Sequence, residues 1–359
     1  MNTVADFIIA TLAQYGVKPI FGYPGAAILP LLESIRSHPT MEWVTTRHEA
    51  TAAYAASAQG KLSANLSVCM SSSGPGASNL TTGILDAHLD RAPMLAITGL
   101  LPTWKQSRQD FQDIDQATLF ASITGMSVEC KNIQQLPAML KMCIGYALKK
   151  RDVVHLAIPL DIQEAKVNTL NHLYKLNNKI SKIPFQAAPK AVFDVVAQTL
   201  EKYQRIAIVV GPRATGAGRA IEALSDKLRS PILSTLSAKG IVNKSHNNAF
   251  GVLGIFGKPG IKLTRDILQE IELILTFGVD HLLPFLCDLD GQQKRAFIQC
   301  EPDTNFDSYQ FQKLHNIFGP LNNTALALCD RVTQRKTPLE KTPSVTSHTN
   351  PPPYSTTTV

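Results

Sequence analysis

The sequence predicts an α/β fold with two doubly wound domains, each built on a mostly parallel sheet, followed by a disordered C-terminal tail. Short apolar runs alternate with helical patterns over residues 1–166 and again over residues 190–335. Between these regions, residues 167–189 are rich in asparagine and lysine, which is typical of a linker. Because alternating strands and helices are typical of parallel sheets covered on both faces, we expect one such sheet in each domain.

Composition limits the class of protein. The chain has 359 residues, 44% hydrophobic and 18% charged, so it can bury two large cores. The formal net charge is +7, but the basic residues are scattered, which favours a solvated surface over a nucleic-acid partner. No window reaches about 18 uninterrupted apolar residues, and no C-x-x-C pair occurs. We therefore expect no membrane span, a cytoplasmic location and reduced thiols.

In the first domain, the most informative residues follow predicted strands. A strand over residues 18–21 runs into Gly22-Tyr23-Pro24-Gly25, where glycine and proline predict a tight turn. A strand over residues 41–45 leads to Glu49, which opens an alanine-rich helix ending near Gly60. Small residues let a flat ligand approach, although they are also typical of ordinary helix packing. The other expected elements are helices over residues 3–15, 27–36 and 136–148 and strands over residues 65–70, 94–99 and 153–158.

A glycine-proline loop follows the strand over residues 65–70. Gly74-Pro75-Gly76 lets the backbone turn sharply, and Ser78 and Asn79 are expected near the start of the next helix, whose free N–H groups can face a ligand. Farther along, the polar segment over residues 102–116 holds Phe111-Gln112-Asp113.

The second domain is expected to begin with a helix over residues 191–203. A strand over residues 206–210 runs into the turn Gly211 to Gly218 and then a helix over residues 219–228. Such a turn can hold a diphosphate, but its residues do not match the G-x-G-x-x-G fingerprint, which favours an ordinary turn. Further strands are expected over residues 232–235, 273–277 and 296–298.

Residues 336–359 are rich in threonine, serine and proline, which predicts a disordered tail. The tail contains Pro351-Pro352-Pro353-Tyr354, the pattern of a WW-domain ligand, and ends in Thr357-Thr358-Val359, a pattern that PDZ-type domains bind. Both patterns are short enough to arise by chance in such a composition, and chance is the favoured interpretation.

Several motifs in one order make the first domain similar to a known family. They are Phe21-Gly22-Tyr23-Pro24-Gly25, Thr46-Arg47-His48-Glu49, Ser73-Gly74-Pro75-Gly76-Ala77-Ser78-Asn79-Leu80, residues 93–99 and Phe111-Gln112. With these motifs, the domain resembles the pyrimidine-binding domain of thiamine-diphosphate enzymes of the acetolactate synthase and pyruvate oxidase group. Residues 190–335 resemble that group's central domain, which binds FAD in many members.

The resemblance implies a site for thiamine diphosphate. Glu49 would be catalytic, because the family's glutamate bonds to a nitrogen of the aminopyrimidine ring and drives activation of the cofactor. The resemblance also implies which residues bind the cofactor, namely Pro24, Gly25, Glu49, Gly74 and Asn79. It places Phe111 and Gln112 on the substrate side and gives Gln112 a catalytic role as well. The alternatives are an ordinary acid in the first turn of a helix, for Glu49, and turn or loop chemistry for the others.

The family's third domain binds the cofactor's diphosphate through Mg²⁺ with a Gly-Asp-Gly motif, which this sequence lacks. Asp290-Gly291 with Asn322-Asn323 is the nearest imitation, and we interpret it as chance. We therefore predict no metal ligands in this chain, and Mg²⁺ only if a partner supplies its site. The two halves of each site usually come from different subunits in the family, which implies a homodimer or larger oligomer and a possible diphosphate-binding subunit.

FAD is a possible second cofactor. Family members commonly have an acidic residue in an Ile-Asp-x-x-Pro-like segment, and Glu301 in Ile298-Gln299-Cys300-Glu301-Pro302 could replace it. After Phe111-Gln112 the family often has glutamate, whereas this chain has the shorter Asp113.

Three functions remain open from the sequence. The chain could be part of a thiamine-diphosphate enzyme that acts on pyruvate-type 2-oxo acids as a decarboxylase, oxidase or ketol transferase. It could instead be a non-catalytic relative that acts as a protein-interaction or regulatory module, or a flavin- or nucleotide-binding module. The presence of Glu49 beside an intact Ser73 to Leu80 segment favours the first.

Overall fold

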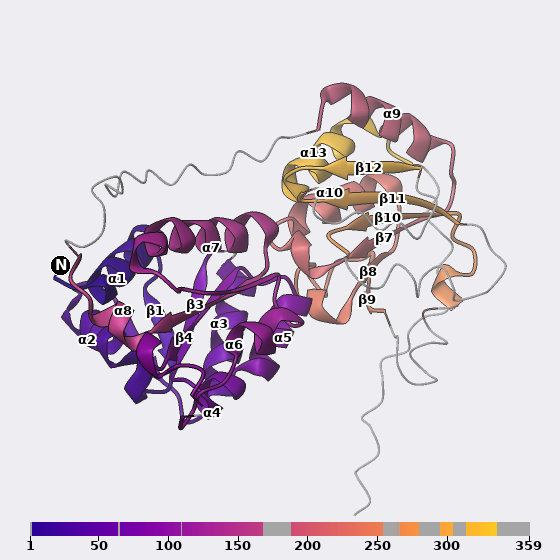
Figure 1. The fold of residues 1–359 in the computed structure, drawn as a ribbon. Helices are drawn as coiled ribbons and strands as arrows, with labels where there is room; N and C mark the ends of the chain where they lie inside the picture. The colour runs from indigo at the N-terminus through magenta and orange to yellow at the C-terminus, as the bar shows by residue number, and fades with distance from the viewer. Residues whose placement is uncertain are drawn as a thin grey trace, which may run out of the picture. The chain divides into compact units, whose positions relative to one another are not determined.

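The computed structural model describes residues 2–63, 65–108, 110–167, 188–253, 264, 266–279, 295–303 and 314–335. The chain divides into two compact units, Met1–Ile183 and Pro184–Val359, and each has its own sheet (Figure 1). The predicted linker over residues 167–189 lies almost entirely outside the described residues, and the predicted tail over residues 336–359 lies entirely outside them. These boundaries stay predictions.

The sheet of the first unit has six parallel strands in the order β2-β1-β3-β4-β6-β5. The strands are β1 (Pro19–Gly22), β2 (Glu42–Thr45), β3 (Ser67–Ser71), β4 (Met94–Leu100), β5 (Met126–Glu129) and β6 (Val153–Pro159). From β1 the chain runs outward to β2 and then returns past β1 to β3. This reversal creates a switch point at the carboxyl ends of β1 and β3, which is where ligands bind in sheets of this type.

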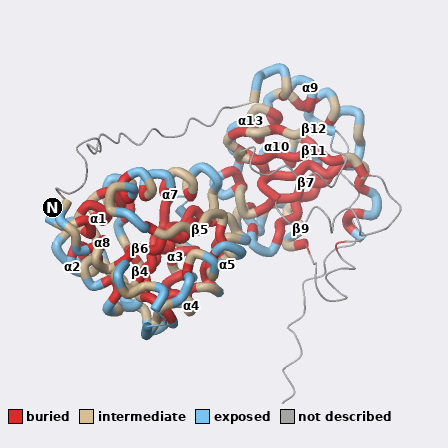
Figure 2. The backbone as a smooth tube through the Cα atoms, viewed as in Figure 1, coloured by how far each residue is buried: buried red, intermediate tan, exposed pale blue. Residues whose placement is uncertain are grey.

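Helices cover both faces of this sheet. One face packs against α1 (Val4–Gln14), α2 (Leu29–Ser37), α7 (Leu136–Lys150) and α8 (Leu160–Glu164), and the other against α3 (Glu49–Ser63), α5 (Thr81–Leu89) and α6 (Gln116–Ala121). Side chains of β3 alternate between the two cores, with Val68 and Met70 in one and Cys69 in the other. The central strands are therefore buried along their whole length (Figure 2).

The sheet of the second unit also has six parallel strands, in the order β12-β11-β10-β7-β8-β9. They are β7 (Ile206–Val210), β8 (Ile232–Ser234), β9 (Ala249–Val252), β10 (Leu273–Phe277), β11 (Ala296–Glu301) and β12 (His315–Phe318). One face is covered by α9 (Lys190–Glu201), α10 (Gly218–Leu228) and α13 (Leu321–Arg331). If β7 is counted as strand 1 and the sheet is read from the β9 edge, the order is 3-2-1-4-5-6, which is typical of dinucleotide-binding sheets. The switch point of this sheet lies between β7 and β10.

The predicted α/β fold class is confirmed, and both sheets are parallel throughout their described strands. The elements that the sequence did not predict include β5, α6, α8, β9, β12 and α13. The loop after β3 also differs from the prediction. A single helical turn, α4 (Pro75–Ser78), comes first and α5 begins only at Thr81, so Asn79 lies between two helices and Ser78 ends the first of them.

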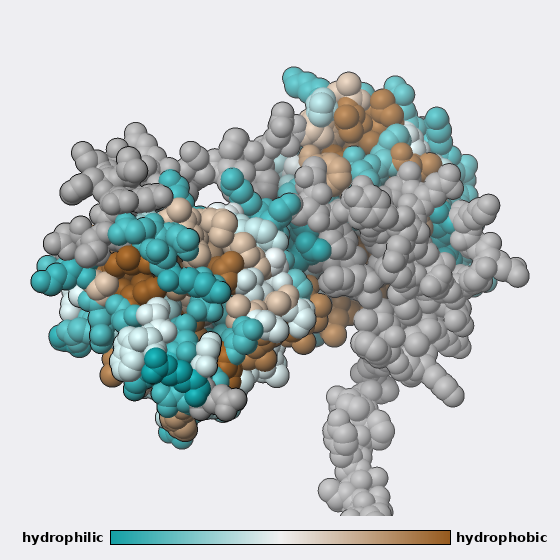
Figure 3. All heavy atoms as spheres, viewed as in Figure 1, coloured by the Kyte–Doolittle hydropathy of each residue, from teal (hydrophilic) through white to brown (hydrophobic). Residues whose placement is uncertain are grey.

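Among the described residues, no helix has the length and apolar character needed to cross a membrane. On the face shown in Figure 3, hydrophilic residues surround small apolar patches over the first unit. The five described cysteines are free and buried, and burial raises the pKa of Cys69 and of Cys143 to about 12, so these thiols stay protonated at neutral pH.

Candidate functional site

Glu49, the first residue of α3, lies beside the loop that follows β3. The Nδ2 of Asn79 donates a hydrogen bond to Glu49 Oε2 at 3.0 Å, and the pair is partly buried. His48 supports the start of the helix, because its Nδ1 accepts a hydrogen bond from Ala50 N at 3.1 Å. The carboxylate of Glu49 is thus held by a side chain thirty residues later in the chain.

The second oxygen of Glu49 faces Gly76. A Cβ built on Gly76 would lie 3.4 Å from Glu49 Oε1, so a larger side chain there would crowd this oxygen. Among the residues that the structure describes, Oε1 has no hydrogen-bond partner. One carboxylate oxygen is therefore fixed by Asn79 while the other can bind a ligand, an arrangement suited to sharing a proton with that ligand.

The turn after β1 packs directly on the loop after β3. A Cβ on Gly25 would overlap Ser72 Cβ, so only glycine fits. Ser72 Oγ also accepts a hydrogen bond from Ala27 N at 3.3 Å, while Pro24 is exposed in the same turn. Gly25 thus lies at the switch point with the residues around Glu49, and Ser72 is a contact that sequence reasoning did not single out.

The Phe111-Gln112 loop packs against Gly74. Gly74 has φ +61°, and a Cβ built on it would lie 2.7 Å from Gln112 Cβ. Gln112 itself has φ +66°, a left-handed conformation that is costly for residues other than glycine and is concentrated at functional sites. Phe111 is 81% exposed. The structure therefore brings both predicted substrate-side residues next to the predicted pyrimidine-pocket loop.

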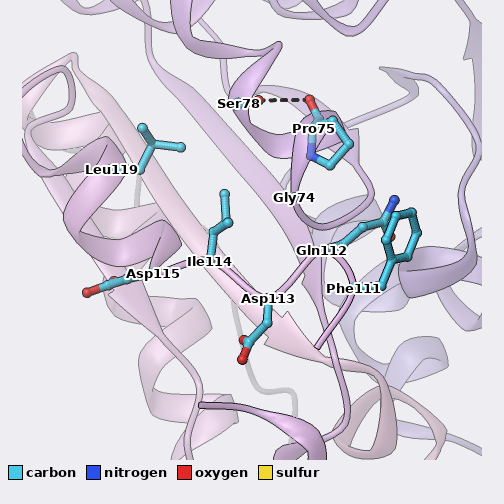
Figure 4. Close-up of a pocket in the computed structure, with 9 residues that line it drawn as sticks. All are labelled: Gly74, Pro75, Ser78, Phe111, Gln112, Asp113, Ile114, Asp115 and Leu119. Atoms are coloured by element: carbon cyan, nitrogen blue, oxygen red, sulfur yellow. Dashed lines mark hydrogen bonds between the residues drawn. The ribbon is translucent and has the colours of Figure 1, made fainter. Parts of the chain in front are cut away.

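An open cavity of about 470 Å³ lies between this loop, α4 and α6 (Figure 4). Pro75, Ile114 and Leu119 give it an apolar wall, whereas the carboxylates of Asp113 and Asp115 are directed away from Pro75. Asp115 caps α6, since its side chain accepts hydrogen bonds from Thr118 N at 2.9 Å and Thr118 Oγ1 at 2.6 Å. The cavity therefore suits the uncharged part of a ligand.

His155 on β6 supports the helix that carries Leu119. Its Nε2 is 2.8 Å from Thr98 Oγ1 and its Nδ1 is 2.9 Å from Ser127 Oγ. Ser127 Oγ donates to Ala117 O in α6 at 2.9 Å, so the hydroxyl accepts from Nδ1–H. Burial lowers the pKa of His155 to about 3, so the ring is neutral. Sequence reasoning missed this role, because the partners come from three separate elements, β4, β5 and α6.

The residues around Glu49 fit an aminopyrimidine ring, since Asn79 holds one carboxylate oxygen and the other lies beside Gly76, which has no side chain. They do not provide for a metal. Within the described ranges, no group of three or more histidine, cysteine, aspartate or glutamate side chains could hold a metal ion. In the sequence that comes nearest to the family's metal-binding motif, residues 290–291 lie outside the described residues, and Asn322 and Asn323 lie in α13.

Comparison with known families gives two matches. Residues 2–119 match the model described as "Thiamine pyrophosphate enzyme, N-terminal TPP binding domain", and residues 193–328 match "Thiamine pyrophosphate enzyme, central domain". These matches confirm the resemblance that the motifs indicated.

Individual relatives agree. The chain is 31% identical over 282 residues to a probable acetolactate synthase large subunit of Methanocaldococcus jannaschii, covering 76% of this chain and 46% of that one. It is 26% identical over 335 residues to the pyruvate oxidase of Lactiplantibacillus plantarum, covering 92% and 54%. It is 30% identical over 301 residues to an uncharacterized 42.6 kDa protein of Pseudomonas amyloderamosa, covering 84% and 74%. The chain thus spans about half the length of the acetolactate synthase relatives.

Proposed function

The chain belongs to the thiamine pyrophosphate enzyme family, and on this basis we propose that its first unit binds the aminopyrimidine half of thiamine diphosphate against Glu49. The observation that carries the proposal is the 3.0 Å hydrogen bond from Asn79 Nδ2 to Glu49 Oε2. It fixes the carboxylate and leaves Oε1, beside Gly76, for the ring nitrogen.

When bound, thiamine diphosphate supplies the nucleophilic carbon that attacks the carbonyl group of a 2-oxo acid. Glu49 holds the proton shared with the ring nitrogen at Oε1, and Asn79 keeps the carboxylate oriented. Gly25 and Gly74 let the turn after β1 and the Gln112 loop pack closely on the loop after β3, beside Glu49. Proton exchange by a positioned carboxylate contributes about 10²- to 10⁴-fold to a rate.

The substrate is a small 2-oxo acid of the pyruvate type, which is decarboxylated, oxidised or used for ketol transfer. The names of the relatives, acetolactate synthase and pyruvate oxidase, support this class. Phe111 and Gln112 lie on the substrate side, with Gln112 in a catalytic role. The apolar wall formed by Pro75, Ile114 and Leu119 suits the alkyl group of such an acid.

The diphosphate and Mg²⁺ are bound by a module outside these 359 residues, in another polypeptide or in further sequence. The family models that match cover an N-terminal and a central domain, and neither matched stretch contains Gly-Asp-Gly. A homodimer or larger oligomer and a cytoplasmic location complete the proposal.

Calorimetry tests the cofactor site. Thiamine diphosphate with Mg²⁺ is titrated into the native chain, into Glu49→Gln and into Glu42→Gln, a control that changes an exposed glutamate of β2. We expect weak, saturable binding by the native chain and by Glu42→Gln, and at least about tenfold weaker binding by Glu49→Gln, the loss of one charge-assisted hydrogen bond. Equal affinities of the native chain and Glu49→Gln, or no heat from the native chain, would contradict the proposal.

A further inference from the structure

The switch point of the second unit is the place where FAD would bind if this unit kept the family's second cofactor. In sheets with this strand order, the diphosphate of a dinucleotide lies over the turn after the first strand, and the second glycine of G-x-G-x-x-G lets it approach the backbone. The turn after β7 has Gly211 and Gly216 at the first and last glycine positions of this pattern. Arg213 stands where the second glycine is required.

The backbone at this switch point is closed. Gly211 N donates to Phe277 O at 2.8 Å, so the turn after β7 is bonded to the end of β10. A Cβ on Gly211 would overlap Gly278 O, and a Cβ on Gly278 would lie 2.7 Å from Ala214 N. The two turns that should part around a diphosphate are therefore in direct contact.

The side chain of Arg213 crosses the mouth of the same crevice. Its Nη1 is 3.2 Å from Glu301 Oε2, at the end of β11, and its Nη2 is 2.8 Å from Asp303 Oδ2. Strand β10 lies between β7 and β11 (Figure 1), so this ion pair joins the ends of two strands that are not neighbours in the sheet. It is 3% exposed, and Gln299 Nε2 completes the network by donating to Glu301 Oε1 at 3.0 Å.

Charge adds to this steric closure. Glu301 is the residue that could replace the acid of the family's Ile-Asp-x-x-Pro-like segment, and its carboxylate is fully buried against Arg213. A diphosphate that displaced the guanidinium would break the ion pairs of Arg213 with Glu301 and Asp303 and bring its own negative charges next to these carboxylates. Breaking a buried ion pair is strongly destabilising, so this exchange is unfavourable.

From these contacts we infer that the crevice of the second unit is filled by the network of Arg213, Glu301 and Asp303, and that this unit does not bind FAD or another dinucleotide at its switch point. The network takes the place of the ligand and ties the end of β7 to the end of β11. This inference is independent of the thiamine diphosphate site, because it concerns residues of the second unit alone.

A flavin titration tests the first half of the inference. FAD, and separately ADP as its adenine-nucleotide half, is titrated into the full chain while flavin fluorescence and heat are followed. We expect a colourless protein and no saturable binding up to about 1 mM ligand. Stoichiometric binding of FAD by the native chain would overturn the inference, whatever the outcome with thiamine diphosphate.

A double-mutant cycle tests the second half. The midpoint of denaturant unfolding is measured for Arg213→Met, for Glu301→Gln with Asp303→Asn, and for all three together. Because the guanidinium neutralises the two carboxylates, we expect Arg213→Met to lower the midpoint and the neutralised carboxylates to restore part of it. If Arg213→Met does not fold, Arg213→Lys replaces it in the same cycle. Strictly additive effects would mean that Arg213 does not hold these carboxylates, and would overturn the inference.

Discussion

The two sheets reverse their winding at comparable places, yet the two switch points are built differently. Between β1 and β3, Gly25 and Gly74 pack against Ser72 and Gln112, but no described ion pair fills the opening, and Glu49 Oε1 beside Gly76 has no described partner. Between β7 and β10, two glycines are in backbone contact and Arg213 fills the opening with an ion pair. Topology therefore supplies the position of a possible site, and a few side chains decide whether it is open.

The difference has a measurable consequence. A charged residue at an open switch point should affect ligand binding and leave stability nearly unchanged. A charged residue at a closed one should affect stability and leave ligand binding nearly unchanged. Substitutions at the two places therefore separate the two kinds of site.

At the open switch point, Glu49→Gln should give the largest effect. We expect thiamine-diphosphate-dependent turnover of pyruvate by the assembled enzyme to fall by about 10²- to 10⁴-fold, because a glutamine side chain cannot share a proton with the ring. The free energy of unfolding should change by less than about 0.5 kcal/mol, since the side chain is only partly buried. Glu42→Gln is the matched control for turnover. If Glu49→Gln and Glu42→Gln turned over pyruvate at the same rate, Glu49 would not be catalytic.

Arg213→Met makes the opposite test at the closed switch point. Removing the guanidinium breaks its ion pairs with Glu301 and Asp303, which should lower the free energy of unfolding by about 3–5 kcal/mol. The more exposed pair between Arg331 and Asp194 provides a control in the same unit, and Arg331→Met should cost less than about 1 kcal/mol. A similar cost for the two substitutions in denaturant unfolding would mean that the second switch point is not closed by charge.

A pair of glycine substitutions examines the wall of the open site. Gly74→Ala places a methyl group 2.7 Å from Gln112 Cβ at a φ of +61°, so both strain and crowding oppose it. Gly216→Ala, at φ +86° with no atom within 4 Å, is opposed by strain alone. We expect Gly74→Ala to be more destabilising by about 1–3 kcal/mol in denaturant unfolding, the usual cost of overpacking. Equal costs would indicate that the Gln112 loop moves away freely.

A pH-dependent effect concerns His155, which supports α6 beside the cavity. Its pKa is about 3 in the folded protein and 6.5 in a free side chain, so the unfolded chain binds more protons between these values. Stability should therefore fall as the pH is lowered from 6.5 toward 3, with a contribution from His155 of up to about 1.4 kcal/mol per pH unit. Denaturant unfolding of native chain and His155→Gln across this range measures the slope. An unchanged slope in His155→Gln would mean that this ring is not buried in its neutral form.

Sequence reasoning located the strands that lie at the centre of each sheet. Ile206–Val210 is a continuous apolar run and Leu273–Phe277 is interrupted only by Thr276, and both were predicted with their observed bounds because burial on both faces leaves this pattern. The unpredicted strands β5, β9 and β12 are all edge strands and are only partly buried, so no apolar run marks them. Helix α13 buries Leu321, Ala325 and Leu328 at helical spacing, a pattern that could have predicted it.

At both switch points, local motifs could be predicted from the sequence but long-range contacts could not. The motifs around Glu49, Gly74 and Asn79 are local, so a family resemblance could group them from the sequence alone. The hydrogen bond between Glu49 and Asn79, and the contact of Arg213 with Glu301, join residues far apart in the sequence. Such pairs depend on how the strand ends pack, which a local sequence pattern does not reveal. For this reason the sequence around Arg213 predicted only an ordinary turn.

Ligand-observed NMR with thiamine, which lacks the diphosphate, tests the central claim most directly. Saturation is transferred from the protein to the bound ligand, and the protons that receive it identify the half of the ligand in contact. In the proposed site Glu49 and the glycine loops contact the aminopyrimidine, so the native chain should transfer saturation mainly to the ring proton and methyl group of that half, and Glu49→Gln should lose most of the signal. Equal transfer to both halves of thiamine, or a signal that Glu49→Gln leaves unchanged, would contradict a pyrimidine site at the first switch point.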